Sequence, residues 1–145
     1  MDGVVHLRDV KEADLPIFFE HQLDPVAYQM AGMPSRDREA YMAHWAKNMR
    51  DDRNDNQTIL FNGQVVGYIV SFPTEGECEV GYWIGRDFWG RGIATQALSL
   101  FLTEIKTRPL YAHVVKDNVG SRRVLEKCGF SLAGENDEEF IFVKM

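Results

Sequence analysis

The feature that most constrains this chain is a strand-to-helix turn built around two glycines. Tyr82-Trp83-Ile84 ends an apolar strand, Trp89-Gly90-Arg91-Gly92 forms the turn, and Ile93-Ala94-Thr95 opens a helix. The first N–H groups of a helix have no partner within it, and the helix dipole adds positive charge there. Glycines lack a Cβ and let an anion approach these groups, and Arg91 adds a formal charge. The stretch therefore predicts a binding site for a pyrophosphate.

The residues after the turn argue against the two commonest phosphate-binding loops. A nucleoside-triphosphate loop would place Lys and then Ser or Thr directly after its last glycine, where this chain has Ile93 and Ala94. A dinucleotide-binding turn would need a third glycine in an early βαβ unit, whereas this turn lies beyond mid-chain without one. Taken alone, Gly90 and Gly92 are also compatible with a purely structural role in shaping the turn.

Two further motifs help to predict which ligand the turn binds. After the next strand come Asn118-Val119-Gly120-Ser121 and then Glu126-Lys127-Cys128-Gly129-Phe130. Together with the turn, they resemble the GNAT superfamily of acetyl-CoA-dependent N-acetyltransferases. The chain is most similar to the branch of ribosomal-protein N-terminal (alanine) acetyltransferases, in which a Trp at the position of Trp89 is typical. The resemblance, strongest from Cys78 to Phe130, implies one N-acetyltransferase domain over residues 1–145 with acetyl-CoA as cosubstrate and no metal.

Composition is compatible with that resemblance. The chain has 145 residues, 45% of them hydrophobic and 26% charged, as expected for a single globular domain. Its net charge of -6 argues against a nucleic-acid partner. No apolar run is long enough for a membrane span, and the acidic start Met1-Asp2-Gly3 is not typical of a signal peptide. Cys78 and Cys128 lack metal-ligand spacing, so we expect a reduced cytoplasmic protein, either a monomer or a homodimer.

Hydrophobic periodicity and turn residues predict a mixed α/β or α+β fold. One helix is expected from Asp14 to about His21, a second after Pro34-Ser35 with Ser35 as its N-cap, a third after Gly92, and a fourth from about Gly120 to Lys127. Asn62-Gly63 predicts a hairpin turn, and Tyr41, Trp45 and Met49 predict a core-facing helix stripe. The expected strands are Val4–Arg8, Thr58–Phe61, Val65–Ser71, Cys78–Ile84, Leu110–Val115, Ser131–Ala133 and Phe140–Lys144.

The resemblance implies a central, mostly antiparallel sheet, splayed between strands 78–84 and 110–115 and flanked by about four helices. The pantetheine arm of the cofactor would lie in this gap, where unpaired backbone groups can bond its amides. A free N–H near Tyr82 to Ile84 would bond the thioester oxygen. Asn118 would contact the cofactor arm, although it could also cap the following helix. Arg123, in a basic cluster with Arg122 and Lys127, would bind the cofactor or form part of a solvated helix face.

The resemblance also suggests catalytic residues. Glu79 occupies the place of a strand glutamate that faces the acceptor, and we expect it to act as general base, with Glu77 on the same strand face as a weaker candidate. A weak base is enough for a peptide N-terminus, because an α-amine has a pKa of about 7.7–8.0 against about 10.4 for lysine. Edge-strand surface charge is the alternative role for both glutamates.

The leaving thiolate lacks the proton donor that is usual in the superfamily. Where many members carry Tyr before the Glu-Lys-x-Gly-Phe run, this chain has Leu125. Ser121 is the alternative donor, although local capping would also explain it. The predicted acceptor is a primary amine, either a protein N-terminus or a small molecule. A non-catalytic CoA-binding or sensing domain is the competing hypothesis, because Leu125 replaces the tyrosine.

Overall fold

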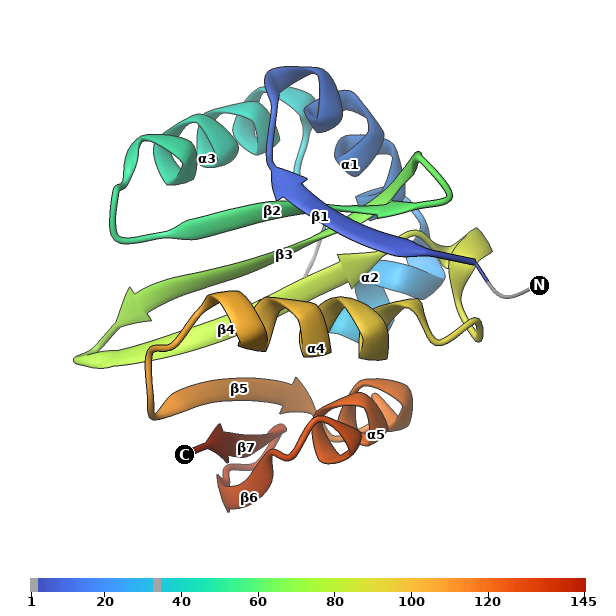
Figure 1. Cartoon of the computed structure of the whole chain (residues 1–145). Helices are drawn as coiled ribbons and strands as arrows, with labels where there is room; N and C mark the ends of the chain where they lie inside the picture. The colour runs from blue at the N-terminus through green and yellow to red at the C-terminus, as the bar shows by residue number, and fades with distance from the viewer. Residues whose placement is uncertain (1–2, 33–34) are drawn as a thin grey trace.

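The computed structural model describes residues 3–32 and 35–145, which form one seven-stranded sheet with helices on both faces (Figure 1). The strands follow the order β1-β2-β3-β4-β5-β7-β6 across the sheet. Neighbouring β4 and β5 are parallel and the other neighbours are antiparallel, as the resemblance implied. The strands are β1 (Val5–Asp9), β2 (Asp55–Phe61), β3 (Gln64–Thr74), β4 (Glu77–Ile84), β5 (Leu110–Val115), β6 (Ser131–Glu135) and β7 (Glu139–Lys144).

The described residues contain five α-helices and two short 3-10 helices. They are η1 (Glu12–Asp14), α1 (Leu15–Gln22), α2 (Pro25–Ala31), α3 (Arg38–Arg50), η2 (Arg86–Phe88), α4 (Ile93–Glu104) and α5 (Val119–Lys127). Helix α4 contacts β1, β3 and β4, α5 contacts α4 and β5, and α1 contacts α2, α3 and β3. No helix in the described part of the chain combines the length and apolarity that a membrane span requires.

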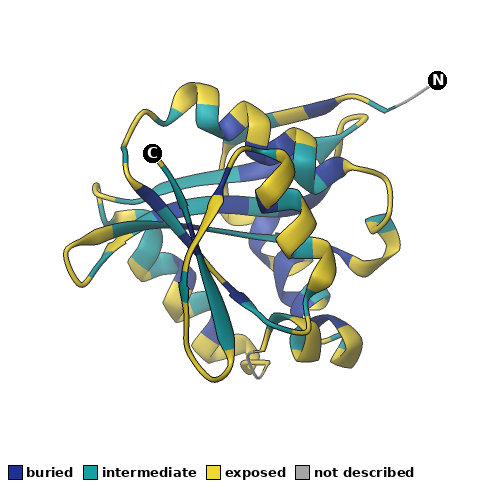
Figure 2. Cartoon of the chain, turned by 90° about the horizontal axis from the view of Figure 1, so that it is seen from below, coloured by how far each residue is buried: buried dark blue, intermediate teal, exposed yellow. Residues whose placement is uncertain are grey.

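Two apolar clusters hold the helices on the sheet. The larger cluster packs α4 and α5 against the strands around the fully buried Phe101, Leu98 and Ile69. The smaller cluster packs α1 and α3 on the other face, where Tyr41 and Trp45 are buried as predicted. Figure 2 shows the buried residues along the middle of the sheet and on the inner sides of the helices. Side chains alternate between faces along a strand, and β3 contributes to both clusters, with Val66 and Ile69 in the larger one and Tyr68 and Val70 packed against the smaller one.

The structure corrects several local predictions. Helix α2 was not expected, although Asp24 caps it by accepting from the N–H of Val26 and Gly32 ends it in the left-handed conformation. Helix α3 begins two residues later than predicted, because Asp37 and not Ser35 caps it by accepting from the N–H of Ala40. Pro34 lies outside the described residues.

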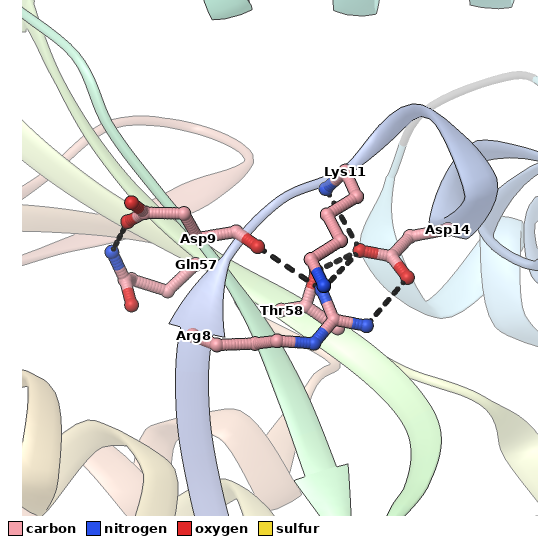
Figure 3. Close-up of polar contacts among 6 residues, drawn as sticks. All are labelled: Arg8, Asp9, Lys11, Asp14, Gln57 and Thr58. Atoms are coloured by element: carbon pink, nitrogen blue, oxygen red, sulfur yellow. Dashed lines mark hydrogen bonds and ion pairs between the residues drawn. The ribbon is translucent and has the colours of Figure 1, made fainter.

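A buried carboxylate connects β1, β2 and the start of α1 (Figure 3). Asp14 accepts two hydrogen bonds from the guanidinium of Arg8, at 2.7 and 2.8 Å. It also accepts from the backbone N–H of Lys11 and from the hydroxyl of the buried Thr58. Burial alone would raise the pKa of Asp14, but these hydrogen bonds outweigh it and lower the pKa to about 2. The carboxylate therefore stays ionised inside the protein.

Candidate active site

The sheet opens between β4 and β5. Their register contains two pairs, Cys78 with Leu110 and Glu79 with Tyr111, and pairing stops there although both strands continue. The other edge of β4 stays paired with β3 up to Ile84, and β5 stays paired with β7 along its length. The splay predicted between strands 78–84 and 110–115 is therefore confirmed. It leaves backbone N–H and C=O groups along both strands without a sheet partner, and such groups need another one.

A cavity of about 460 Å³ lies at the open end of this gap. Four parts of the chain line it, namely α2, the end of β4, the glycine turn with the start of α4, and α5. Most of the residues predicted to bind the cofactor are in its wall, and so is Ser121. The predicted residues that line it are Tyr82, Trp83, Ile84, Trp89, Gly90, Gly92, Ile93, Ala94, Thr95, Asn118, Ser121 and Arg123, whereas Arg91 and Glu79 lie outside the wall.

The sequence did not predict the α2 wall. Ala27, Met30 and Ala31 of α2 line the cavity on the side opposite α4 and α5. Close packing fixes α2 there, because a Cβ on Gly32 would collide with a methyl group of Val115 in β5. The signal that could have revealed α2 was Asp24-Pro25, an N-cap followed by proline in the first helical turn.

The glycine turn leaves the N-terminus of α4 uncapped. Gly90 and Gly92 have φ values of 77° and 74°, and within the described parts of the chain no side chain caps the first turn of the helix. A Cβ at either glycine would meet no atom within 4 Å, so the backbone conformation and not crowding favours glycine here. The indole N–H of Trp89 donates to the carbonyl of Ile84 at 2.8 Å and fixes the turn against the end of β4. The arrangement suits an anion at the helix N-terminus.

The basic side chains divide into two groups. Arg123 and Lys127 of α5 line the cavity, so they add positive charge to its wall. Arg91 lies over the ring of Phe88, at 5.7 Å from its centre, and Arg86 pairs with Asp24 at 3.4 Å. Arg122 is also turned away from the cavity wall and lies over the ring of Phe140. The charge available to an anion in the cavity therefore comes from α5 more than from the turn.

Asn118 and Ser121 form the start of α5 beside the gap. Asn118 is the N-cap, and its side-chain oxygen accepts from the N–H of Ser121 at 3.1 Å. The hydroxyl of Tyr82, on β4, lies 2.6 Å from the hydroxyl of Ser121 across the cavity wall. Sequence reasoning placed these residues in one site but did not foresee this contact, which joins positions 39 residues apart.

Glu79 lies at the last pair of β4 and β5 and belongs to a different cluster. Its carboxylate is 3.4 Å from Nε2 of His113 on β5, and Nδ1 of His113 is 3.5 Å from Glu139 on β7. Burial raises the pKa of Glu79; His113 opposes this rise, and Glu139, Glu77 and Glu75 add to it. In residues 3–32 and 35–145 no His, Cys, Asp or Glu side chains form a group suited to a metal ion.

The comparisons with known proteins agree with this geometry. A model of the acetyltransferase (GNAT) domain matches residues 5–131. The chain belongs to this family. A Bacillus subtilis protein assigned as a ribosomal N-acetyltransferase, YdaF, is 28% identical over 105 residues, which cover 68% of this chain and 57% of that relative. The chain therefore spans little more than half the length of this relative.

Solved GNAT structures share the whole fold. Mycobacterium smegmatis RimJ, in complex with a CoA disulfide, superposes with a TM-score of 0.78 and 26% identity, covering 98% of this chain and 82% of that one. RimL, a ribosomal L7/L12 α-N-protein acetyltransferase in complex with coenzyme A, superposes with a TM-score of 0.81 and 19% identity, covering 97% and 93%. The predicted GNAT fold is thus confirmed.

Proposed function

We propose that this chain is an acetyl-CoA-dependent N-acetyltransferase that transfers the acetyl group to a primary amine by direct attack on the thioester. The observation that carries the proposal is one cavity that joins an uncapped helix N-terminus to a gap between two parallel strands. An anionic group fits the first part, and an arm rich in amides fits the second. Two structural relatives named above were solved with CoA or a CoA disulfide.

The residues present fit this cosubstrate. The first turn of α4, with Arg123 and Lys127, would hold the pyrophosphate, and Asn118 would contact the arm. The backbone of β4 from Tyr82 to Ile84 would supply an N–H to the thioester oxygen and stabilise the negative charge that develops there. Trp83 lines the cavity, and its indole N–H is buried without a hydrogen-bond partner among the described residues.

The proposed acceptor is the α-amine of a protein N-terminus. RimL is named as an α-N-protein acetyltransferase and YdaF as a ribosomal N-acetyltransferase. Acidic side chains of β4 and β7, Glu79 and Glu139, would favour a positively charged amine. A small-molecule amine is the second candidate.

The cysteines Cys78 and Cys128 are free, which suits a reducing compartment, and we place the reaction in the cytoplasm.

Measuring CoA release from acetyl-CoA over a panel of N-terminal peptides, lysine side-chain peptides and small amines tests the function. We expect turnover that is fastest with a free α-amine. Tight binding of CoA without turnover on any acceptor would identify the sensing domain instead, for which the buried Leu125 is the supporting observation. If ATP competed with acetyl-CoA for the site as strongly as CoA does, the chain would instead be a general phosphate-binding protein.

Replacing Glu79 with Gln is expected to lower kcat/KM for an N-terminal peptide by about tenfold, because an α-amine needs only a weak base. The pH profile should also change. Below the amine pKa, log kcat/KM of the wild type falls with slope one, and it falls more steeply, by about one further log unit in all, over the pH range in which Glu79 takes up its proton. Since burial raises the pKa of Glu79, this steepening begins above the range of an ordinary glutamate. The Glu79→Gln profile should keep slope one.

The matched control is Glu77→Gln. Glu77 is exposed and lies two residues away on the same face of β4. This variant should leave both the rate and the slope of the profile nearly unchanged. Equal losses in the two variants would show that Glu79 contributes only to the general negative charge of this face.

A further inference from the structure

A glycine interrupts β4 on the face of the sheet that carries Glu79. Alternate residues of β4, Val80 and Tyr82 among them, pack into the larger apolar cluster together with α4. Glu79, Gly81 and Trp83 therefore belong to the opposite face, because successive side chains of a strand point to opposite faces. Gly81 lies two residues beyond the last pair of β4 with β5, where the gap between these strands has begun to open.

The fold does not require glycine at this position. The φ of Gly81 lies outside the left-handed region that favours glycine. A Cβ on Gly81 would have, as its nearest neighbours among the described residues, a ring carbon of Phe72 and a methyl group of Val70, each at an ordinary contact distance of 4.0 Å. By contrast, a Cβ on Gly67 in β3 would collide with the carbonyl oxygen of Trp83. Packing explains Gly67 but not Gly81.

Glycine inside a strand makes the fold less stable than alanine would, and it often marks a place where a ligand comes close to the backbone. Gly134 also lies within a strand and has room for a Cβ, but its strand, β6, is at the edge of the sheet. Gly81 lies in a central strand, two positions from the candidate general base Glu79. The space over Gly81 therefore suits part of a ligand that also reaches Glu79.

This space has an apolar side and a charged side. Val70 and Phe72 of β3 pair with Gly81 and Glu79, so their side chains lie on the same face of the sheet. Phe72 is half-buried, yet within the described part of the chain it belongs to neither apolar cluster. On the other side of β4, His113 of β5 lies 3.4 Å from Glu79. A ligand with a basic group at Glu79 and an apolar group against Phe72 would fit both sides.

Resting on the proposed function, we propose that Gly81 leaves room for the side chain of the acceptor's first residue and so sets how large that side chain can be. Residues 79 and 81 are about 7 Å apart along the strand, a distance comparable to one hydrogen bond plus the length of a leucine side chain. With the α-amine at Glu79, the first side chain would lie over Gly81, and Phe72 and Val70 would form its apolar wall. Gly81 is thus a specificity-determining residue.

Acceptor peptides that differ only in their first residue test this role. The measured quantity is the ratio of kcat/KM for a peptide that begins with glycine to kcat/KM for one that begins with leucine. We expect Gly81→Ala to raise this ratio about tenfold over the wild type, and Gly81→Val to raise it further, because each added methyl group takes space from the first side chain. Effects of the variant on folding or on the cofactor are common to both peptides and cancel in the ratio.

Phe72→Ala removes the apolar wall beside Gly81 and should act in the opposite direction. A larger space accepts the leucine side chain more easily, so the ratio should fall below that of the wild type. In the double variant, Gly81→Ala should raise the ratio less than it does alone, because the space lost at one position is regained at the other. Since Phe72 is outside both apolar clusters, we expect Phe72→Ala to fold, and circular dichroism checks this.

Gly134→Ala is the matched control, because it adds a methyl group to a strand glycine that β7 separates from the gap. It should leave the ratio unchanged. An unchanged ratio in Gly81→Ala and Gly81→Val, with turnover intact, would overturn this inference alone, and so would a loss of CoA binding in Gly81→Ala. Turnover with small amines but with no N-terminal peptide would overturn it too. Absence of turnover on every amine in the wild type would overturn the proposed function and this inference with it.

Discussion

The Gly92→Asp variant is expected to bind CoA on the order of 100-fold more weakly than the wild type. Gly92 is the N-cap of α4, and a side chain there would project into open space beside the first helical turn. A carboxylate at this place would stand a few ångströms from the pyrophosphate, and two negative charges at about 4 Å repel by several kcal/mol at a protein surface. Isothermal titration calorimetry with CoA measures the loss.

The Gly92→Asn variant separates the effect of the added negative charge from the effect of replacing a glycine in the backbone. Asn has nearly the same shape as Asp, and both tolerate the left-handed conformation that Gly92 adopts at φ 74°. We expect Asn to weaken CoA binding only a few fold, and the difference between Asp and Asn to shrink at high salt. Equal binding by the two variants would mean that no anionic group sits at this helix N-terminus.

The second large effect is expected on stability. Asp14→Ala should lower the free energy of unfolding by about 3 kcal/mol, because it leaves the guanidinium of Arg8 and the buried hydroxyl of Thr58 without their shared acceptor. Urea unfolding followed by circular dichroism measures this change. Asp51→Ala is the control, since Asp51 makes a similar two-pronged contact with Arg53 at the surface and should barely shift the unfolding midpoint.

The same carboxylate predicts a pH dependence. The pKa of Asp14 is about 2 in the folded protein, below its value of about 3.9 in an unfolded chain. The unfolded state therefore binds the proton first as the pH falls, and the stabilisation is present above pH 4 and lost between about pH 4 and 2. The wild type should lose about 2 kcal/mol more than Asp14→Ala over this interval. Parallel losses in the two proteins would show that Asp14 is not ionised in the fold.

Local sequence patterns predicted much of the fold, because each such pattern depends only on residues that are close together in the sequence. The hairpin at Asn62-Gly63 forms with both residues at positive φ, and strands 78–84 and 110–115 flank the gap as the resemblance implied. The short helix α2 was not predicted, because the hydrophobic residues among its seven positions show no clear helical periodicity. Ser35 was a wrong cap because a cap must directly precede the first turn, and Asp37 holds that place.

The arrangement of the candidate site was harder to foresee. Glycines and a helix start can be recognised within ten residues, and most of the residues predicted around them line one cavity. The contacts of Glu79 with His113 and of His113 with Glu139 depend instead on the register of three strands. The contact of Tyr82 with Ser121 depends on how closely α5 approaches β4. Such distances are set by packing over the whole chain and leave no local signal.

The two residue pairs between β4 and β5 have a thermodynamic consequence. Across this junction the sheet lacks the hydrogen bonds that join its other neighbours, so separation of the β1-to-β4 part from the β5-β7-β6 part breaks few of them. A ligand that bonds to both open edges supplies the missing links. Its binding energy then adds to folding stability, by about 2.7 kcal/mol at a concentration of 100 times its Kd. Amide hydrogen exchange along β5 should slow as this added stability increases. The exchange rate therefore measures what fraction of the protein has cofactor bound.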